Sequence, residues 1–195
     1  MREVVVLAFV SLDGVMQAPG GEGEDPSGDF DLEGWTVPYF DEVGANEMSK
    51  QMGQPFDLLL GRKTYEIFAS YWPHHDSPIN EARKYVVSNS AISTDWEETI
   101  QIMSDVVTEI EKLKQQDGPM LQVHGSSNLI QTLLAHDLAD QLWLKVFPVT
   151  LGKGKRLFGE GTIPAAFALT DSKVSPSGVI IASYRREGEV QLGSF

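Results

Sequence analysis

The chain has 195 residues, no cysteine and a formal net charge of −13. This length suits one domain with a buried core, and the missing cysteines exclude disulfides, thiolate zinc sites and a cysteine nucleophile. The acidic balance argues against a nucleic-acid surface, because binding phosphates requires clustered Lys and Arg. The apolar run after Arg2 is too short to span a bilayer and is followed by no small-residue cleavage site, so we expect a cytoplasmic protein with no membrane partner.

The first half of the chain alternates predicted strands with predicted helices. Residues 4–10 form a continuous apolar, β-branched run, which is typical of a strand buried on both faces of a sheet. Residues 17–34 are rich in Gly, Pro and acids and predict a long loop, of the kind that often carries function or acts as a lid. Residues 38–52 place apolar side chains at helical spacing, with acids early and a lysine late, so they predict a helix. A strand at 56–60, a helix at 63–70 and a strand at 83–88 follow.

The second half predicts an antiparallel end to the sheet. Residues 104–116 place Val106, Ile110 and Leu113 on one helical face and stop at Asp-Gly-Pro. The remaining elements are a strand at 120–123, a helix at 127–135, a strand at 142–149 and a closing pair of strands at 167–170 and 179–184. This order indicates a single α/β domain over residues 1–195, with a sheet that is parallel in the middle and antiparallel at its C-terminal edge.

Three predicted strands end in polar residues, and ligands of open α/β sheets collect at such ends. Gly61 is followed by two cations and a hydroxyl, which could hold a phosphate at a helix start; a solvated helix start with a Thr cap is the alternative. Gly125 is followed by two serines, which could expose amides to an anion or simply cap a helix. Ser88 and Asn89 end the third strand and are also ordinary turn formers. Together the three junctions could span a dinucleotide, although the fingerprint G-x-G-x-x-G is absent and a classical Rossmann domain is therefore disfavoured.

The order of several short motifs resembles the dihydrofolate reductase-like superfamily, and most closely the reductase domain of the bifunctional riboflavin-biosynthesis deaminase-reductase. The likeness covers residues 4–185 and is carried by SLDG, W-x-x-P, GRKTYE, VVSNS, HGSSNLIQTLL and LKVFPVTLGKGKRLF. The resemblance implies a three-layer αβα fold with a mixed, mostly parallel sheet, frequent homodimers, and hydride transfer from NADPH to a pteridine- or pyrimidine-like substrate.

The resemblance also assigns cofactor contacts by position. The cofactor phosphates would contact Gly61, Arg62, Lys63 and Thr64, the adenosine end would meet Ser88 and Asn89, and the pyrophosphate would lie at Gly125, Ser126, Ser127 and Asn128. Many relatives carry an arginine where this chain has Asn89, so NADH remains possible beside NADPH. His124 stands where riboflavin-pathway reductases tend to carry an acid. This departure argues against the riboflavin-pathway substrate for this chain.

Two carboxylates are candidate catalytic groups. Asp13 ends the first strand in SLDG, with an Asp-Gly turn as the structural alternative. Asp41 follows the W-x-x-P helix entry and could orient or protonate a substrate, with a helix-start acid as the alternative. Ser11, Trp35 and Tyr39 are the candidate substrate contacts, because a hydroxyl and aromatic rings can line a slot for a flat heterocycle.

Other polar clusters receive structural interpretations. The adjacent His74 and His75 point opposite ways on an extended loop with no further ligand, so no metal site is expected. The segment G-K-G-K-R, residues 152–156, is interpreted as a solvated turn. No Lys or Arg lies between Glu3 and Ser49, which disfavours a strongly anionic substrate.

The sequence therefore predicts a homodimeric NAD(P)H-dependent reductase for a small heterocyclic or imine-bearing substrate, similar to 5-amino-6-(5-phosphoribosylamino)uracil reductase. A folate or pterin reductase and a non-catalytic nucleotide-binding relative are the alternatives.

Overall fold

The computed structural model describes residues 1–194; Phe195, the last residue of the predicted domain, lies outside the described residues. The strands are β1 (Val4–Ser11), β2 (Phe56–Gly61), β3 (Lys84–Val87), β4 (Thr99–Ile102), β5 (Met120–Val123), β6 (Gln141–Phe147), β7 (Ala166–Val174) and β8 (Ile180–Gly188). The helices are α1 (Glu42–Met52), α2 (Arg62–Tyr71), α3 (Pro78–Glu81), α4 (Val106–Gln115) and α5 (Ser127–Ala135), with short 3-10 turns η1 (Val37–Tyr39) and η2 (Trp72–His74).

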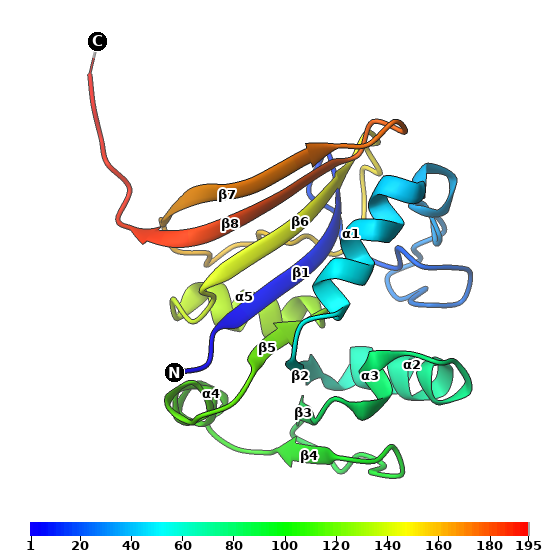
Figure 1. The fold of residues 1–195 in the computed structure, drawn as a ribbon, viewed down its shortest axis with the longest axis vertical. Helices are drawn as coiled ribbons and strands as arrows, with labels where there is room; N and C mark the ends of the chain where they lie inside the picture. Colours follow the sequence, from blue (N-terminus) through cyan, green and yellow to red (C-terminus); the bar gives the residue numbers. More distant parts are fainter. Residues whose placement is uncertain (195) are drawn as a thin grey trace.

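The strands form one sheet in the order β4-β3-β2-β5-β1-β6-β8-β7 (Figure 1). The strands from β4 to β6 run parallel, whereas β8 pairs antiparallel with β6, and β7 pairs antiparallel with β8. The predicted mixed sheet with an antiparallel C-terminal hairpin is confirmed. In strand β1 most side chains are buried, as its unbroken apolar run predicts for a central strand.

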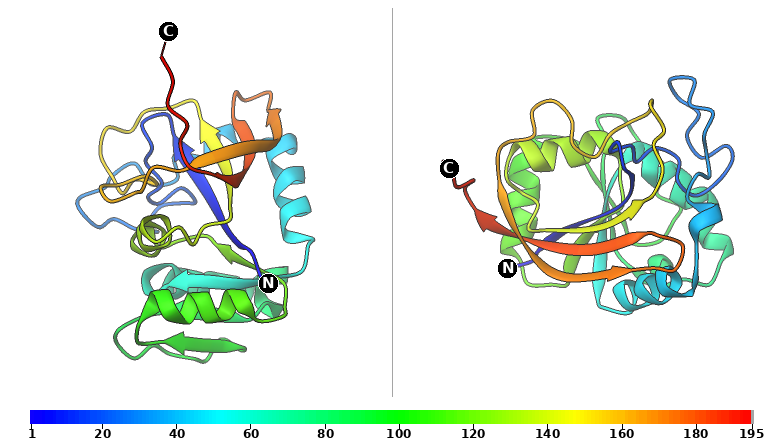
Figure 2. Two further views of the ribbon diagram at one scale, coloured as in Figure 1. Left: turned by 90° about the vertical axis from the view of Figure 1, so that its left-hand side faces the viewer. Right: turned by 90° about the horizontal axis from the view of Figure 1, so that it is seen from above.

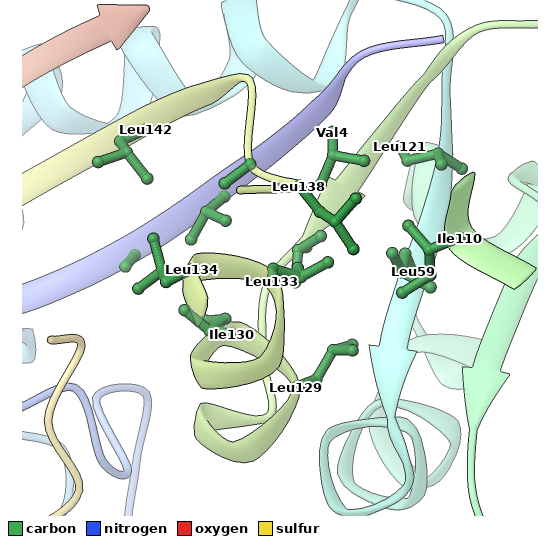
Figure 3. Close-up of a cluster of buried hydrophobic side chains, with 14 of the residues drawn as sticks. Val4, Leu59, Ile110, Leu121, Leu129, Ile130, Leu133, Leu134, Leu138 and Leu142 are labelled. Atoms are coloured by element: carbon green, nitrogen blue, oxygen red, sulfur yellow. The ribbon is translucent and has the colours of Figure 1, made fainter. Parts of the chain in front are cut away.

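Helices cover both faces of the sheet, and α1 and α5 lie on opposite sides (Figure 2). Alternate residues of β1 point to opposite faces because the strand period is two. Val4 packs with α5 and α4 in the largest hydrophobic cluster (Figure 3), and Val6 belongs to the same cluster. On the other face, Leu58 and Leu60 of β2 pack against α2 and α3. The fold is thus three layers, αβα, as predicted.

Several element boundaries differ from the sequence prediction. The predicted helix at 38–52 is split, because Asp41 caps α1 by accepting the Gly44 N–H at 2.9 Å and η1 precedes it. Strand β4 and the four-residue helix α3 were not predicted. The four residues of β4 lie at the sheet edge and pair only with β3, so they carry little of the apolar burial that marks a strand in a sequence. The closing hairpin is longer than predicted at both strands.

Within residues 1–194, no helix is long and apolar enough to cross a membrane.

Candidate functional site

The three polar junctions lie on one rim of the sheet. Strands β3, β2 and β5 are consecutive neighbours and run parallel, so their carboxyl ends, at residues 87, 61 and 123, share an edge. The prediction that these chain reversals gather at a single rim is confirmed.

Two of the junctions touch each other. The Gly61 N–H donates to the carbonyl oxygen of Gly125 at 3.1 Å. A methyl group added to Gly61 would lie 2.1 Å from Ser126 Oγ, and one added to Gly125 would lie 2.5 Å from Thr64 Oγ1. Gly125 also has a φ of +149°, which side chains rarely adopt. Both glycines are therefore required by the close approach of the two segments.

Each of these glycine segments leads into a helix on its own side of the sheet. Helix α2 begins at Arg62, and its N-cap residue Gly61 offers no side chain to the first-turn amides. Thr64 lies inside this first turn, so it is not the cap that the alternative interpretation required. Helix α5 begins at Ser127, and its N-cap residue Ser126 accepts a hydrogen bond from the Leu129 N–H at 3.5 Å, as the capping alternative predicted. The start of α2, which has no side-chain cap, therefore suits an anion.

Arg62 links the first junction to the third. Its Nε donates to Glu66 Oε1 at 2.6 Å, and its Nη1 donates to the Ser90 hydroxyl. Ser88 Oγ donates to the Ser90 carbonyl at 2.7 Å, which shapes the turn that carries Asn89. Asn89 is exposed, as are Arg62 itself, Lys63 and Asn128. A guanidinium and an ammonium are thus exposed on one rim beside the first turns of α2 and α5, and this combination of donors fits a diphosphate.

Asp13 holds two loops together. Its carboxylate accepts from Ser11 Oγ at 2.5 Å and from the backbone N–H groups of Leu151 and Gly152 at 3.1 and 2.8 Å. The Ser11 hydrogen bond, with those amides, lowers the pKa of Asp13 to about 2. Asp13 lies at the end of β1 as predicted, but at neutral pH it is an acceptor and has no proton to give.

Asp41 is likewise engaged. Hydrogen bonds from the Gly44 N–H and then from Ser177 lower its pKa to about 2. Asp41 is thus an acid at a helix start, as the structural alternative predicted. The catalytic role of Asp41 stays a prediction.

The two aromatic residues predicted to contact a substrate, Trp35 and Tyr39, both pack against Phe147. Trp35 is buried, its Nε1 donates to the Gln17 carbonyl at 2.8 Å, and its ring packs edge-on to Phe147 at 5.3 Å. Tyr39 is half-buried near the same Phe147 ring, at 6.2 Å. Trp35 therefore has a packing role that fixes the 17–34 loop.

The basic turn at 152–156 is mostly exposed, as interpreted from the sequence, and it also binds the acidic loop. Lys155 pairs with Asp25, which is buried, and Lys153 pairs with Asp31 at 2.8 Å. The reason is complementary charge: the loop between residues 17 and 34 supplies only acids, and this turn supplies the cations. The negative charge of the loop is therefore partly neutralised.

The sequence interpretation missed a polar group on the α1 side of the sheet. Lys145 of β6 is only 5% exposed, and burial lowers its pKa to about 8. His124, next to the Gly125 junction, has its pKa lowered to about 4 by burial and then by the charge of Lys145. The two side chains thus face the same interior region. The signal in the sequence was the single lysine inside LWLKVF, a charge in an otherwise buried strand.

Two surface hollows lie away from this rim. One of about 380 Å³ lies beside α5 and is lined by apolar residues such as Leu133 and Phe158; another of about 350 Å³ surrounds Arg2 and Asp57 at the amino ends of the strands. Neither contains a predicted cofactor contact, and the chemistry of the rim, rather than the depth of a hollow, identifies the site. Among residues 1–194 no cluster of His, Asp or Glu is arranged to hold a metal ion.

Comparison with known proteins agrees with this fold. The model of the RibD C-terminal domain matches residues 2–181. The chain belongs to the RibD C-terminal domain family. It is 26% identical to the uncharacterized protein YyaP of Bacillus subtilis over 196 residues, covering 96% of each chain.

Two solved structures share the fold of this RibD C-terminal domain. A protein from Shewanella sp. PV-4 assigned to riboflavin biosynthesis superposes with a TM-score of 0.69 at 23% identity, covering 96% of this chain and 99% of that one. Dihydrofolate reductase from Enterococcus faecalis, complexed with NADP(H), gives a TM-score of 0.60 at 15% identity and coverages of 94% and 96%. The dihydrofolate reductase-like fold expected from the motifs is confirmed.

Proposed function

We propose that this protein is an NADPH-dependent reductase that transfers a hydride to a small heterocyclic or imine-bearing substrate, as 5-amino-6-(5-phosphoribosylamino)uracil reductase does. The observation that carries the proposal is the contact of Gly61 with Gly125 at two adjoining helix starts, in a member of the RibD C-terminal domain family. When bound, the reduced nicotinamide would supply the hydride, and the protein would hold it against the substrate carbon.

The rim residues have distinct tasks in this proposal. First-turn amides of α2 and α5 bind the diphosphate, and Lys63 adds charge from solvent. Arg62 supports NADPH over NADH, because its guanidinium reaches the Ser88–Ser90 turn where the adenosine end is expected and could pair with a 2′-phosphate. Asn89, which lacks a charge, leaves that task to Arg62.

Asp13 acts as a positioning residue in this proposal. Its carboxylate fixes the end of β1 against residues 151 and 152, beside the rim. Proton transfer to the substrate would need another group, because Asp13 and Asp41 are both carboxylates at neutral pH.

We also propose, from the same family resemblance, a cytoplasmic homodimer. Strand β7 offers an exposed sheet edge with Leu169 and Val174 at 56% and 70% exposure, a surface that a second copy could cover. A single species at the monomer mass in analytical ultracentrifugation, at micromolar concentration, would contradict it.

Binding and turnover test the function separately. Titration with NADPH, followed by Trp fluorescence, measures affinity, and absorbance of the reduced cofactor measures oxidation with flavin precursors, pterins, folates and reactive carbonyls. Arg62→Ala should weaken NADPH binding roughly 10- to 100-fold, because a charge-assisted hydrogen bond contributes about 1.5–3 kcal/mol.

Lys112→Ala is the matched control, since Lys112 is an exposed cation on α4 that pairs with Glu109. Equal affinities of the two variants would contradict the assignment of Arg62. Binding of NADPH, with no NADPH oxidation in the presence of any tested substrate, would favour a nucleotide-binding protein over an enzyme.

A further inference from the structure

A chain of polar contacts crosses from β6 to the β5 junction beneath α1. Lys145 Nζ donates to the side-chain Oε1 of Gln51 at 2.7 Å. The backbone carbonyl of Gln51 accepts from Gln122 Nε2 at 3.1 Å. Gln122 Oε1 lies 3.2 Å from His124 Nε2, which completes the chain. We call these four residues the Lys145 cluster. It ends one residue before Gly125, so it adjoins the proposed diphosphate site.

Lys145 has spare hydrogen-bonding capacity. An ammonium carries three donors, and among the described residues Gln51 is the only acceptor of Lys145. Lys84, the other buried lysine, differs: it donates to the carbonyls of Asn80 and Glu97, and it packs over the Trp96 ring. Lys84 therefore uses two donors within the fold, whereas Lys145 uses one and keeps two that could bind a ligand atom.

Aromatic rings adjoin the Lys145 cluster on both sides. Lys145 Nζ lies 5.4 Å from the centre of the Phe9 ring. The centres of the Phe9 and Phe40 rings are 6.3 Å apart, and Phe40 is 47% exposed. On the α2 side the Phe68 ring lies 5.8 Å from the His124 ring. Phe9, Phe68 and His124 are half-buried. These rings offer faces or edges to a flat heterocycle, with an ammonium at its border.

We propose that Lys145 is the catalytic residue that orients the substrate and donates the proton, binding the ring nitrogen or oxygen at which negative charge develops. This inference rests on the proposed reductase function. As a hydride forms a C–H bond at the carbon of a C=N or C=O group, the π-electron pair moves to the nitrogen or oxygen. That atom takes a proton from the Lys145 ammonium, which becomes a neutral amine and regains a proton from water.

The other titratable groups around the substrate region are poor donors. His124, facing Lys145 from β5, is neutral near pH 7 because burial and then Lys145 lower its pKa to about 4. Glu47, facing it from α1, is buried, which raises its pKa, but its ion pairs with Lys173 and Lys50 outweigh this and lower it. A lysine whose pKa is about 8 stays protonated at neutral pH and gives up its proton readily.

The test compares wild type with Lys145→Met and Lys145→Arg, with Lys112→Met as the exposed-lysine control. We expect Lys145→Met to bind NADPH within twofold of wild type and to lose about 100-fold or more in kcat, the range of general-acid catalysis. The wild-type kcat should fall above pH 8, and this fall should be absent from the residual activity of Lys145→Met. Lys145→Arg should still bind the substrate. Its kcat should not fall near pH 8, because arginine does not deprotonate there.

A measurement without turnover runs in parallel. In ¹³C-labelled lysine spectra, one signal, missing in Lys145→Met, should titrate near pH 8, and the His124 ring should titrate higher in that variant. Titration of Lys145 like the exposed lysines would overturn the inference, as would a kcat of Lys145→Met within threefold of wild type. Failure of wild type to bind NADPH would instead refute the proposed function.

Discussion

Replacing Gly61 by alanine tests the contact on which the proposed cofactor site depends. The added methyl would lie 2.1 Å from Ser126 Oγ, 2.9 Å from Ser126 Cβ and 3.0 Å from Ser126 N, all far inside contact distance. The hydroxyl can rotate away, but the backbone nitrogen cannot, so the two rim segments must separate. Such overpacking costs about 1–3 kcal/mol, and we expect the free energy of unfolding in urea to fall by about 2 kcal/mol.

Matched variants separate overpacking from a general effect of alanine. Gly61→Ala combined with Ser126→Gly removes both side-chain contacts, so about half of the lost stability should return, giving a coupling energy of about 1 kcal/mol. Gly44→Ala is the control, because Gly44 lies inside α1 with only an ordinary 3.6 Å contact, and alanine there should stabilise by about 0.5–1 kcal/mol. NADPH affinity should drop in Gly61→Ala and not in Gly44→Ala. A Gly61→Ala protein as stable as wild type, with unchanged affinity, would refute the close packing of the two junctions.

Two further predictions concern charged groups beside the rim. Lys145→Met should stabilise the protein at pH 7 by about 2 kcal/mol. The lowered pKa of Lys145, from 10.5 to about 8, means that burying its charge costs about 3 kcal/mol, and the variant avoids this cost. The variant also loses the hydrogen bond to Gln51, which contributes about 1 kcal/mol. Since the folded state binds fewer protons, wild-type stability should rise between pH 8 and 10.5 and the difference should shrink there, as urea titrations would show. Asp13→Asn should be less stable than wild type at pH 7 because it can accept fewer hydrogen bonds. As Asp13 has a lowered pKa, the difference should fade as the pH drops from 4 to 2, and a constant difference in acid unfolding curves would contradict this.

Local patterns predicted the fold and the rim. The apolar run of β1 marked the sheet centre, and Gly61 and Gly125 marked chain reversals because glycine before cations or hydroxyls interrupts an apolar run. The sheet order then brought these reversals together, as parallel strands require.

The internal contacts of the site could not be predicted, because they join residues far apart in the chain. Lys145 and Gln51 meet across 94 positions, and Asp13 and Gly152 across 139. No local pattern distinguishes a carboxylate that fixes a loop from one that meets a substrate. Trp35 illustrates the same limit, since only the fold shows that its indole packs on Phe147 and holds the 17–34 loop.

The most direct test of the central claim is an NMR titration of ¹⁵N-labelled protein with NADPH. Binding of the diphosphate by the helix starts predicts saturable shifts that are largest for the amides of Arg62, Lys63, Thr64, Ser126 and Ser127. Shifts confined to the hollow beside α5 or to the one around Arg2, with these amides unchanged, would contradict the account.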